Sequence, residues 1–417
     1  MQVKIVDAIM GAGKTSAMIH HINNLPIGTR ILYITPYLTE VGRVIKRCLF
    51  KAFKQPDKQR GSKISGIKEL FKQGVNIAST HSLFREFDEE IIGLAFKQNY
   101  ILVMDEVTDV VETLAISKDD LDTIRREYTE VVDGHILRWK ETSQSYKGKF
   151  EEYKRLCDLG CVGIYNNNVI LWLFPVSTFR GFSEIFILTH MFKAQVQKYY
   201  FDFYGIKYDY LYITGDSVDG DTPYTLTDEP QDYDYSKYAK LINVLDNEKM
   251  NRIGDSKGAL SKIWYERNSD NKLIGTLKNN MINFFQHYAK TKTRLNMWTT
   301  FKGYDKVLKG KGYARGFVPL NTRATNDYKD KTSVAYCVNR YLNPFIRNFF
   351  LSKGIEVYED YFALSEMLQW LFRSAIRDGK PIDVYIPSKR MRLILQEWLD
   401  EIANGYITRS ISSEEGE

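Results

Sequence analysis

Residues 1–15 read MQVKIVDAIMGAGKT, and this stretch indicates how the whole chain is built. Met1–Ala8 has the β-branched and apolar composition of a buried strand, and the residues from Ser16 to Ile22 follow a helical pattern. The loop between them, Met10–Thr15, is rich in glycine. A strand, a glycine loop and a helix in this order favour phosphate binding, because backbone N–H groups close around the oxygens and the helix N-terminus attracts negative charge.

The loop matches the pattern G-x-x-x-x-G-K-[ST], except that Ala8 stands at the first glycine position. The pattern predicts that Lys14 reaches the β- and γ-phosphates of a nucleotide and that the Thr15 hydroxyl joins the shell of a Mg²⁺ ion. The alternative is a glycine turn that happens to precede Lys-Thr, and the strand before it and the helix after it argue against that. The predicted phosphate-binding residues are Gly11, Ala12, Gly13, Lys14, Thr15 and Ser16.

A second element suits the other side of the metal. Residues 100–106 read YILVMDE, an apolar strand that ends in two adjacent carboxylates, the layout known as Walker B. We expect Asp105 to bind Mg²⁺ through water and Glu106 to orient or deprotonate the attacking water. Such a carboxylate pair is common in loops, so it is the glycine loop about 90 residues upstream that makes the pair specific. The two elements together predict a bound nucleoside triphosphate and Mg²⁺, and ATP is the nucleotide that we infer.

Length and composition describe an ordinary folded protein. A chain of 417 residues exceeds the size of one hydrophobic core, so two domains are expected. Its four cysteines are too few and too scattered for a disulfide framework or a zinc site, and a reducing cytoplasm fits best. No apolar run approaches the roughly 20 residues that a membrane helix needs, so no membrane is expected as a partner.

Positive charge is concentrated in two stretches. Residues 41–76 hold ten Lys and Arg against two acidic residues, and residues 276–316 hold nine against one, whereas the whole chain carries only +6. One stretch in each half of the chain suits a polyanion held by two domains, since phosphate contacts supply most non-specific nucleic-acid affinity. Two solvated surfaces are the alternative.

Other strand ends follow in a specific order. Residues 30–37 (RILYITPY) end in Thr-Pro, and residues 75–84 (VNIASTHSLF) lead to Thr-His. A phosphate loop followed by strand-TP, strand-TH and strand-DE resembles motifs I, Ia, Ic and II of superfamily 2 helicases, with similarity to bacteriophage-encoded members. The resemblance implies that Thr35, Pro36, Thr80 and His81 contact a nucleic-acid backbone. An ordinary strand-end turn and a buried histidine are the alternatives for these two pairs.

Two further segments complete the first half. Glu184–Thr189 (EIFILT), followed by His190, stands where the superfamily has motif III, which couples the nucleotide site to the second domain. The segment before it, residues 115–181, is an insertion that a minimal helicase lacks. A strand-separating or partner-binding element would fit there.

The second half, after a turn-rich linker at 228–234, resembles a second RecA-like domain. Strand-like runs lie at 295–301, 333–339 and 382–386, and residues 316–327 are similar to motif V, which implies that Arg323 and Thr325 contact nucleic acid. A helix is expected over 363–378. Gln369, Arg373 and Arg377 would form one stripe of it, in the place of motif VI, and an arginine there would stabilise the transition state as an arginine finger. A helix with surface arginines is the alternative.

The expected fold is α/β, with two RecA-like P-loop NTPase domains of parallel sheets flanked by helices. Residues 1–227 would form the first domain, with an insertion at about 115–181, and residues 228–417 the second. The resemblance implies an ATP-dependent nucleic-acid helicase or translocase in phage DNA replication or recombination, located in the cytoplasm of the infected host. We expect DNA rather than RNA as the polymer, partners from replication or recombination, and a monomer rather than a ring. A viral DNA-packaging motor and a nucleotide-gated DNA-binding protein with little turnover are the alternatives.

Overall fold

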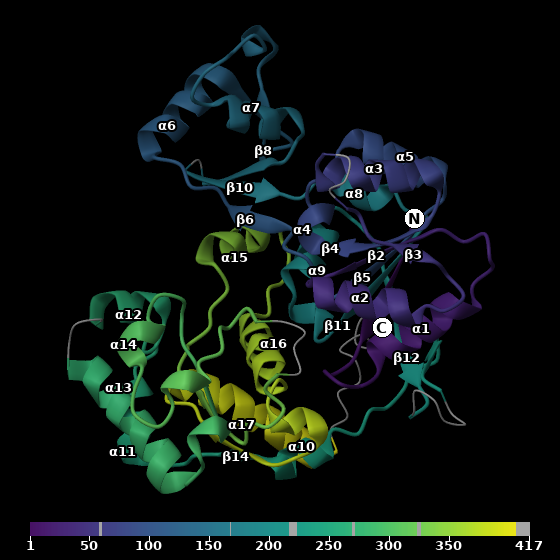
Figure 1. Cartoon of the computed structure of the whole chain (residues 1–417). Helices are drawn as coiled ribbons and strands as arrows, with labels where there is room; N and C mark the ends of the chain where they lie inside the picture. The colour runs from purple at the N-terminus through teal and green to yellow at the C-terminus, as the bar shows by residue number, and fades with distance from the viewer. Residues whose placement is uncertain (58–60, 167, 217–222, 269–271, 323–326, 406–417) are drawn as a thin grey trace. The chain divides into compact units, whose positions relative to one another are not determined.

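The computed structural model describes residues 1–57, 61–166, 168–216, 223–268, 272–322 and 327–405. These residues form two compact units (Figure 1). The first unit comprises Met1–Asp7, Gly13–Asp228 and Asn343–Val357, and the second comprises Ala8–Ala12, Glu229–Leu342 and Tyr358–Glu417. Because neither unit is one continuous stretch, they differ from the two consecutive domains that the sequence suggests.

The first unit is built on an eight-stranded sheet with the order β13-β12-β1-β11-β5-β2-β4-β3. Every neighbouring pair is parallel except β12 and β13, which form an antiparallel hairpin. Central strands such as β2 and β11 are buried on both faces, which explains their unbroken apolar runs. The strands are β1 (Gln2–Asp7), β2 (Ile31–Thr35), β3 (Phe53–Lys54), β4 (Asn76–Thr80), β5 (Ile101–Asp105), β11 (Glu184–Thr189), β12 (Asp209–Thr214) and β13 (Thr225–Thr227).

Helices cover both faces of this sheet. Figure 1 shows α1 and α2 on one side and α5 and α8 on the other. Short polar side chains start two of the helices: Ser62 accepts from the Ser65 N–H at the head of α3, and Asp88 accepts from the Ile91 N–H at the head of α5. The helices are α1 (Lys14–Asn24), α2 (Leu38–Arg47), α3 (Lys63–Gln73), α4 (His81–Phe84), α5 (Glu89–Lys97), α8 (Val176–Arg180) and α9 (Val196–Phe203).

The connections of the sheet change direction next to β1. After β1, the chain passes through α1 and returns to the sheet as β2, which lies beyond β11 and β5. After β11, the chain passes through α9 and returns to the sheet as β12, which lies on the opposite side of β1. Open parallel sheets bind ligands at such a switch point, beyond the carboxyl ends of the strands. We therefore expect a ligand site among the residues that follow β1, β11 and β5.

A second, antiparallel sheet lies within the segment between β5 and β11. Its order is β6-β10-β9-β8-β7, and helices α6 (Lys118–Thr123) and α7 (Glu151–Asp158) accompany it. Trp139 is buried in its core with its ring stacked on Tyr128 at 5.2 Å. Cys157 and Cys161 belong to the same core, and burial raises the pKa of the Cys157 thiol to about 12, so this cysteine is a packing residue. The strands are β6 (Val111–Thr113), β7 (Thr129–Val132), β8 (Ile136–Trp139), β9 (Val162–Tyr165) and β10 (Val169–Leu173).

Helix α15 (Pro344–Leu351) comes from the second half of the sequence but belongs to the first unit. The Asn343 side chain accepts from the Phe345 N–H and starts the helix. Phe349 packs on Phe203 with ring centroids 5.3 Å apart, and Phe350 packs on Tyr199 at 5.8 Å. The helix therefore completes the aromatic core around α9.

The second unit has a four-stranded, fully parallel sheet with the order β14-β17-β16-β15. The strands are β14 (Ile242–Val244), β15 (Asn296–Thr299), β16 (Ser333–Tyr336) and β17 (Ile382–Tyr385). Its helices are α10 (Ser236–Leu241), α11 (Glu248–Asn251), α12 (Lys262–Asn268), α13 (Lys272–Asn283), α14 (Asp305–Leu308), α16 (Glu359–Leu371) and α17 (Lys389–Ala403). The class of α/β folds with parallel sheets flanked by helices is thus confirmed, and it is consistent with two RecA-like domains.

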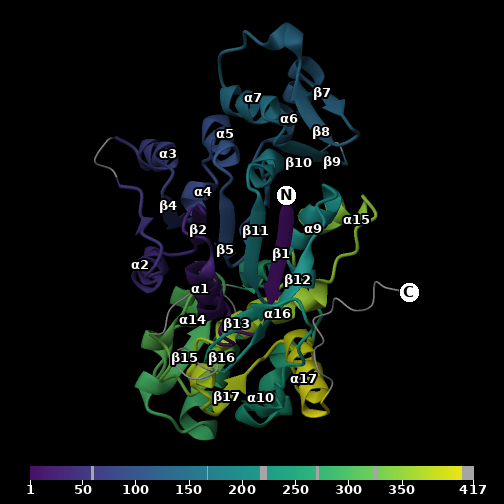
Figure 2. The same ribbon diagram turned by 90° about the vertical axis from the view of Figure 1, so that its right-hand side faces the viewer.

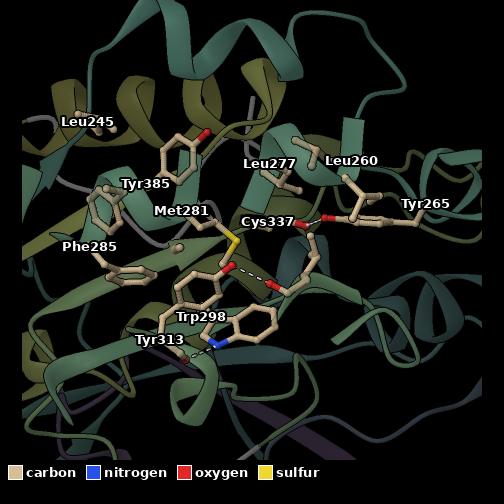
Figure 3. Packing of buried hydrophobic residues seen from close by; sticks show 14 residues of the cluster. Leu245, Leu260, Tyr265, Leu277, Met281, Phe285, Trp298, Tyr313, Cys337 and Tyr385 are labelled. Carbon is tan, nitrogen blue, oxygen red and sulfur yellow. Dashed lines mark hydrogen bonds between the residues drawn. The ribbon is translucent and has the colours of Figure 1, made fainter. Parts of the chain in front are cut away.

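The core of the second unit contains several aromatic residues whose polar atoms are all satisfied (Figure 3). The Trp298 indole N–H donates to the Tyr313 carbonyl at 2.9 Å, and the Tyr313 hydroxyl donates to the Leu308 carbonyl at 2.7 Å. The Tyr265 hydroxyl donates to the Cys337 carbonyl at 2.7 Å. These three large rings can be buried because the polar group of each has a partner.

The expected helix over 363–378 is wrong in its extent. Helix α16 ends at Leu371, and a separate 3-10 turn covers Ala375–Asp378. The Ala375 N–H donates to the Lys331 carbonyl at 2.9 Å, so a tertiary hydrogen bond replaces the helical one. Gln369, Arg373 and Arg377 therefore do not form one helical stripe.

Candidate nucleotide site

The strand ends of the first sheet form a row at one edge. Asp7 at the end of β1 pairs in register with Thr189 of β11, and Leu188 pairs with Asp105 at the end of β5. Farther along, Thr35 of β2 pairs with Thr80 of β4. Most of the candidate residues that the sequence identifies in the first half therefore lie at or just beyond the same carboxyl edge.

The glycines of the loop after β1 have conformations that other residues avoid. Gly11 has φ +86° and Gly13 has φ +88°, both in the left-handed region. Gly13 has a second constraint, because a Cβ atom there would lie 2.8 Å from ring atoms of Tyr224. The Gly13 carbonyl accepts from the Ala17 N–H at 2.9 Å, which begins α1 directly at the loop.

Thr15 and Asp105 meet at this edge although 90 residues separate them. The Thr15 hydroxyl donates to Asp105 Oδ2 at 3.2 Å, and the Tyr33 hydroxyl of β2 donates to the same oxygen at 3.1 Å. Burial raises the pKa of Asp105, whereas Arg43, Lys14 and the two hydroxyls act to lower it. The carboxylate is thus held in one orientation by neighbours from two other elements.

Lys14 is buried, with 8% of its surface exposed, among ionisable groups from β1 and β11. Its ammonium acts electrostatically on Asp7, Asp105 and His190. Burial, with a contribution from Lys14, lowers the pKa of His190 to about 3, so this imidazole is neutral at physiological pH. The cation therefore lies in a poorly hydrated place where its attraction for an anion is weakly screened.

Glu106 has an unusual backbone for its residue type. Its φ is +76°, and its N–H donates to the Leu188 carbonyl of β11 at 2.9 Å. A left-handed conformation costs a residue with a side chain about 1–2 kcal/mol. The hydrogen bond to β11 holds this turn at the end of β5.

Four further residues take part in this edge and were missed by sequence reasoning: Asp7, Tyr33, Gln197 and Tyr224. Asp7 accepts from the Met191 and Phe192 N–H groups, both at 2.7 Å, and so fixes the chain after β11. Gln197 of α9 accepts from the Thr108 N–H at 3.0 Å and so fixes the chain after β5. Of these four residues, only Tyr33 could have been identified from the sequence, because a tyrosine in a buried central strand needs a hydrogen-bond partner for its hydroxyl.

The proposed nucleic-acid contacts differ in accessibility. Thr35 and His81 are buried, with 1% and 9% of their surfaces exposed, whereas Pro36 and Thr80 are partly exposed. Thr80 shares a hydrogen bond with the Ser82 hydroxyl at 3.0 Å. Arg323 and Thr325 lie outside the described residues.

In the second unit, the residues compared with motif VI are separated by the end of α16. Arg373 is buried, with 6% of its surface exposed, and its Nη1 donates to the Leu320 carbonyl at 3.4 Å. Arg377 lies in the following 3-10 turn, and the Gln369 amide donates to Ser365 Oγ at 3.5 Å. Arg373 is thus anchored by its own unit.

The oxygen atoms at the edge of the first sheet fit Mg²⁺. This cation prefers oxygen ligands, keeps several waters and is bound by few protein groups together with substrate phosphates. Thr15 Oγ1 and Asp105 Oδ2 supply two adjacent oxygens of this kind. In the part of the chain that the structure describes, no group of three or more His, Cys, Asp and Glu side chains could hold a metal ion by itself. A Mg²⁺ ion here would therefore depend on a phosphate ligand as well.

The fold and the row of strand ends define an α/β protein of two units, in which a strand, a glycine loop and a helix follow one another along the chain, and a parallel strand two places away from the first strand ends in Asp-Glu. Residues 236–399 match the model of the YonV C-terminal Rossmann-like domain, and residues 111–172 match that of the YonV middle domain. The chain is 39% identical over 413 residues to the SPbeta prophage-derived protein YonV of Bacillus subtilis strain 168, covering 96% of this chain and 99% of the relative. The chain belongs to the YonV family.

Solved structures of helicases have a distantly similar arrangement. Xpd4 of S. tokodaii has a TM-score of 0.46 at 10% identity over 95% of this chain and 94% of its own, and an XPD helicase scores 0.45 at 11% identity over 97% and 95%. The DUF1998 helicase MrfA, solved with DNA and AMPPNP, scores 0.35 at 9% identity over 96% of this chain and 48% of its own. Likeness at this level does not bear on activity. No helix in the described residues is both long enough and apolar enough to span a membrane.

The hydrogen bonds of Asp7 predict a stability effect. We expect Asp7→Asn to lower the free energy of unfolding by about 1–3 kcal/mol, because an amide cannot accept from both the Met191 and Phe192 N–H groups. Urea unfolding measures the change, and Asp209→Asn, at an exposed position on β12, is the control. An unchanged midpoint would show that the two hydrogen bonds contribute nothing.

The same carboxyl group predicts a pH dependence. Burial raises the pKa of Asp7 above its ordinary value of 3.8, although the two backbone hydrogen bonds and Lys14 oppose the shift. The contribution of the protonated form to stability is therefore complete below the ordinary pKa and is lost as the pH rises through the raised one. Melting temperatures measured from pH 4 upward should fall more steeply for the wild type than for Asp7→Asn.

Proposed function

We propose that the protein hydrolyses Mg-ATP and couples the hydrolysis to movement on nucleic acid, as a helicase or translocase. The observation that carries the proposal is the hydrogen bond between Thr15 and Asp105, 3.2 Å long. It joins the end of the glycine loop to the end of the Asp-Glu strand at the switch point of a parallel sheet, and a buried lysine lies beside it. Each feature alone is common, but together they favour phosphoryl chemistry.

Each side chain then has a defined task. Lys14 and the loop N–H groups bind and orient the phosphates, with the lysine attracting the charge that develops on the γ-phosphoryl group. Mg²⁺, when bound next to Thr15 and Asp105, supplies a positive charge that neutralises the phosphate oxygens. Glu106 accepts the proton of the attacking water. By the resemblance to motif VI, Arg373 or Arg377 is the proposed arginine finger.

Nucleic acid is the proposed partner because of the two basic stretches. In residues 41–76, Arg43 pairs with Glu40 at 3.0 Å, Lys68 pairs with Asp88 at 2.6 Å, and Lys51 is buried, so this stretch offers fewer accessible charges than its sequence suggests. In residues 276–316, eight basic side chains remain exposed: Lys290, Lys292, Arg294, Lys302, Lys306, Lys309, Lys311 and Arg315. The second unit is therefore the better candidate for phosphate-backbone contacts.

DNA is the polymer that we propose, in the replication or recombination of a phage. The support is indirect, since the relative from Bacillus subtilis is prophage-derived. The proposed contacts of Thr35, Pro36, Thr80 and His81 would add backbone binding at the edge of the first sheet. The buried positions of Thr35 and His81 limit such contacts to groups that a conformational change exposes.

Phosphate release with a panel of polymers tests the proposal. We expect hydrolysis of ATP to be stimulated at least several-fold by single-stranded or forked DNA and to weaken as salt is raised, because bound phosphates release counterions. Duplex DNA and single-stranded RNA are the comparison arms. Nucleotide-dependent DNA binding without phosphate release would contradict the motor and indicate a gated binding protein. A ring that forms only with ATP and DNA would indicate a packaging motor.

A further inference from the structure

We propose that Tyr224 forms the subsite for the nucleoside, with its ring stacked on the base of the nucleotide whose phosphates lie in the glycine loop. The inference rests on the proposed function and deepens it. Tyr224 lies directly before β13, in the hairpin that β13 forms with β12. It belongs to the same unit as Gly13 and as the Thr15 and Asp105 pair.

The hairpin of β12 and β13 lies next to β1 in the sheet. β12 pairs in parallel with β1, with Lys4 opposite Asp209 and Val6 opposite Leu211. β12 continues to Thr214, whereas β1 ends at Asp7, so the hairpin extends past the end of β1. β13 also packs against α1, the helix that the loop starts. Tyr224 is thereby brought to the glycine loop by two neighbouring elements.

A nucleotide bound at this edge must point in one direction along the sheet. The sheet order places β11 and β5 on one side of β1, and β12 and β13 on the other. Thr15 and Asp105, at the end of β5, are the proposed Mg²⁺ ligands. Because Mg²⁺ binds the β- and γ-phosphates, the γ-phosphate would lie toward β5. The nucleoside at the opposite end of the triphosphate must then lie toward β12 and β13, where Tyr224 is.

The orientation of the Tyr224 ring also suits base stacking. A Cβ atom built on Gly13 would lie 2.8, 2.8 and 2.9 Å from Cδ1, Cε1 and Cγ of Tyr224. Three neighbouring ring atoms at nearly equal short distances mean that Gly13 faces the flat side of the ring, since an edge-on approach would leave the outer two atoms much farther away. Glycine is therefore the only residue type that fits at position 13 under the ring. The ring lies flat against this end of the loop.

The opposite face of the ring is the stacking surface. Tyr224 is partly exposed, and among the described residues no aromatic ring or cation packs against it. A partly exposed aromatic ring that is fixed on one side provides stacking area at little entropic cost. Base stacking on an aromatic side chain contributes to binding with any base, so this subsite should tolerate different bases.

The test compares two ligands that share phosphates but differ in the base. We expect Tyr224→Ala to bind ATP about 10-fold more weakly than the wild type, within the range of one base stack, and to bind inorganic tripolyphosphate as the wild type does. Tyr224→Phe should keep the ATP affinity, because the ring remains. Titration calorimetry with each ligand in the presence of Mg²⁺ gives both constants, and Tyr165→Ala, a partly exposed tyrosine on β9, is the control.

Two results would overturn the inference. Equal ATP affinity in Tyr224→Ala and the wild type would mean that the base does not stack there. An equal loss of ATP and tripolyphosphate binding would mean that the ring only supports the loop. Lys14→Ala separates this inference from the proposed function: if the wild type binds neither ligand, or if Lys14→Ala binds both unchanged, the nucleotide site itself is wrong.

Discussion

Replacing Glu106 with glutamine is expected to slow ATP hydrolysis about 100- to 10,000-fold, the usual contribution of a positioned general base. The amide has nearly the shape of the carboxylate but cannot take the proton of the attacking water. Nucleotide binding should stay close to that of the wild type, because the predicted phosphate contacts come from the loop and from Lys14. Single-turnover phosphate release and ATP titration measure the two effects separately.

The backbone at this position makes Glu106→Gln a clean substitution. The left-handed conformation of Glu106 and the hydrogen bond from its N–H to Leu188 involve only main-chain atoms. Glutamine meets the same conformational cost, so the fold should be unaffected. Glu152→Gln, an exposed residue of α7 that pairs with Arg155 at 2.6 Å, is the matched control. Unchanged hydrolysis in Glu106→Gln would remove this residue from the mechanism.

Local signals explain which elements could be predicted from the sequence. The strands β5 and β11 contain continuous apolar runs, as buried parallel strands do, and β1 has buried apolar residues at Val3, Ile5 and Val6. The glycine loop between β1 and α1 needs φ values that few other residues adopt. The meeting of Thr15 and Asp105 follows from the same logic, because carboxyl ends of parallel strands share one edge. For these elements, sequence pattern and tertiary structure agree.

Other features depend on partners that are distant in the sequence. Nothing around Tyr224 indicates that its ring faces Gly13, and nothing around Asp7 indicates that its carboxyl group binds the chain after β11. Helix α15 looks like part of the second half until its contacts with Phe203 and Tyr199 are known. The early end of α16 has the same cause, since the Lys331 carbonyl takes the Ala375 N–H.

Replacing Lys14 with alanine is expected to abolish measurable hydrolysis, with a loss of about 100- to 1000-fold or more, and also to weaken ATP binding. The effect on binding distinguishes this variant from Glu106→Gln. Lys14 is 8% exposed and acts on Asp7, Asp105 and His190, so its charge belongs to the resting protein as well as to the bound state. Removing Lys14 takes a nearby positive charge away from the buried carboxyl groups of Asp7 and Asp105. We therefore expect the free energy of unfolding to fall.

That second effect requires its own control, because an unfolded variant is inactive for a trivial reason. Thermal melting of Lys14→Ala without ligand shows whether the fold persists, and Lys14→Met tests whether the long alkyl chain restores packing without the charge. Lys262→Ala removes an exposed lysine, 4.0 Å from Glu266, and should leave hydrolysis unchanged. If a folded Lys14→Met variant still hydrolyses ATP at the wild-type rate, the glycine loop is not the phosphate site. A folded but inactive variant would instead mean that the charge acts on the nucleotide, since the packing of the side chain has been kept.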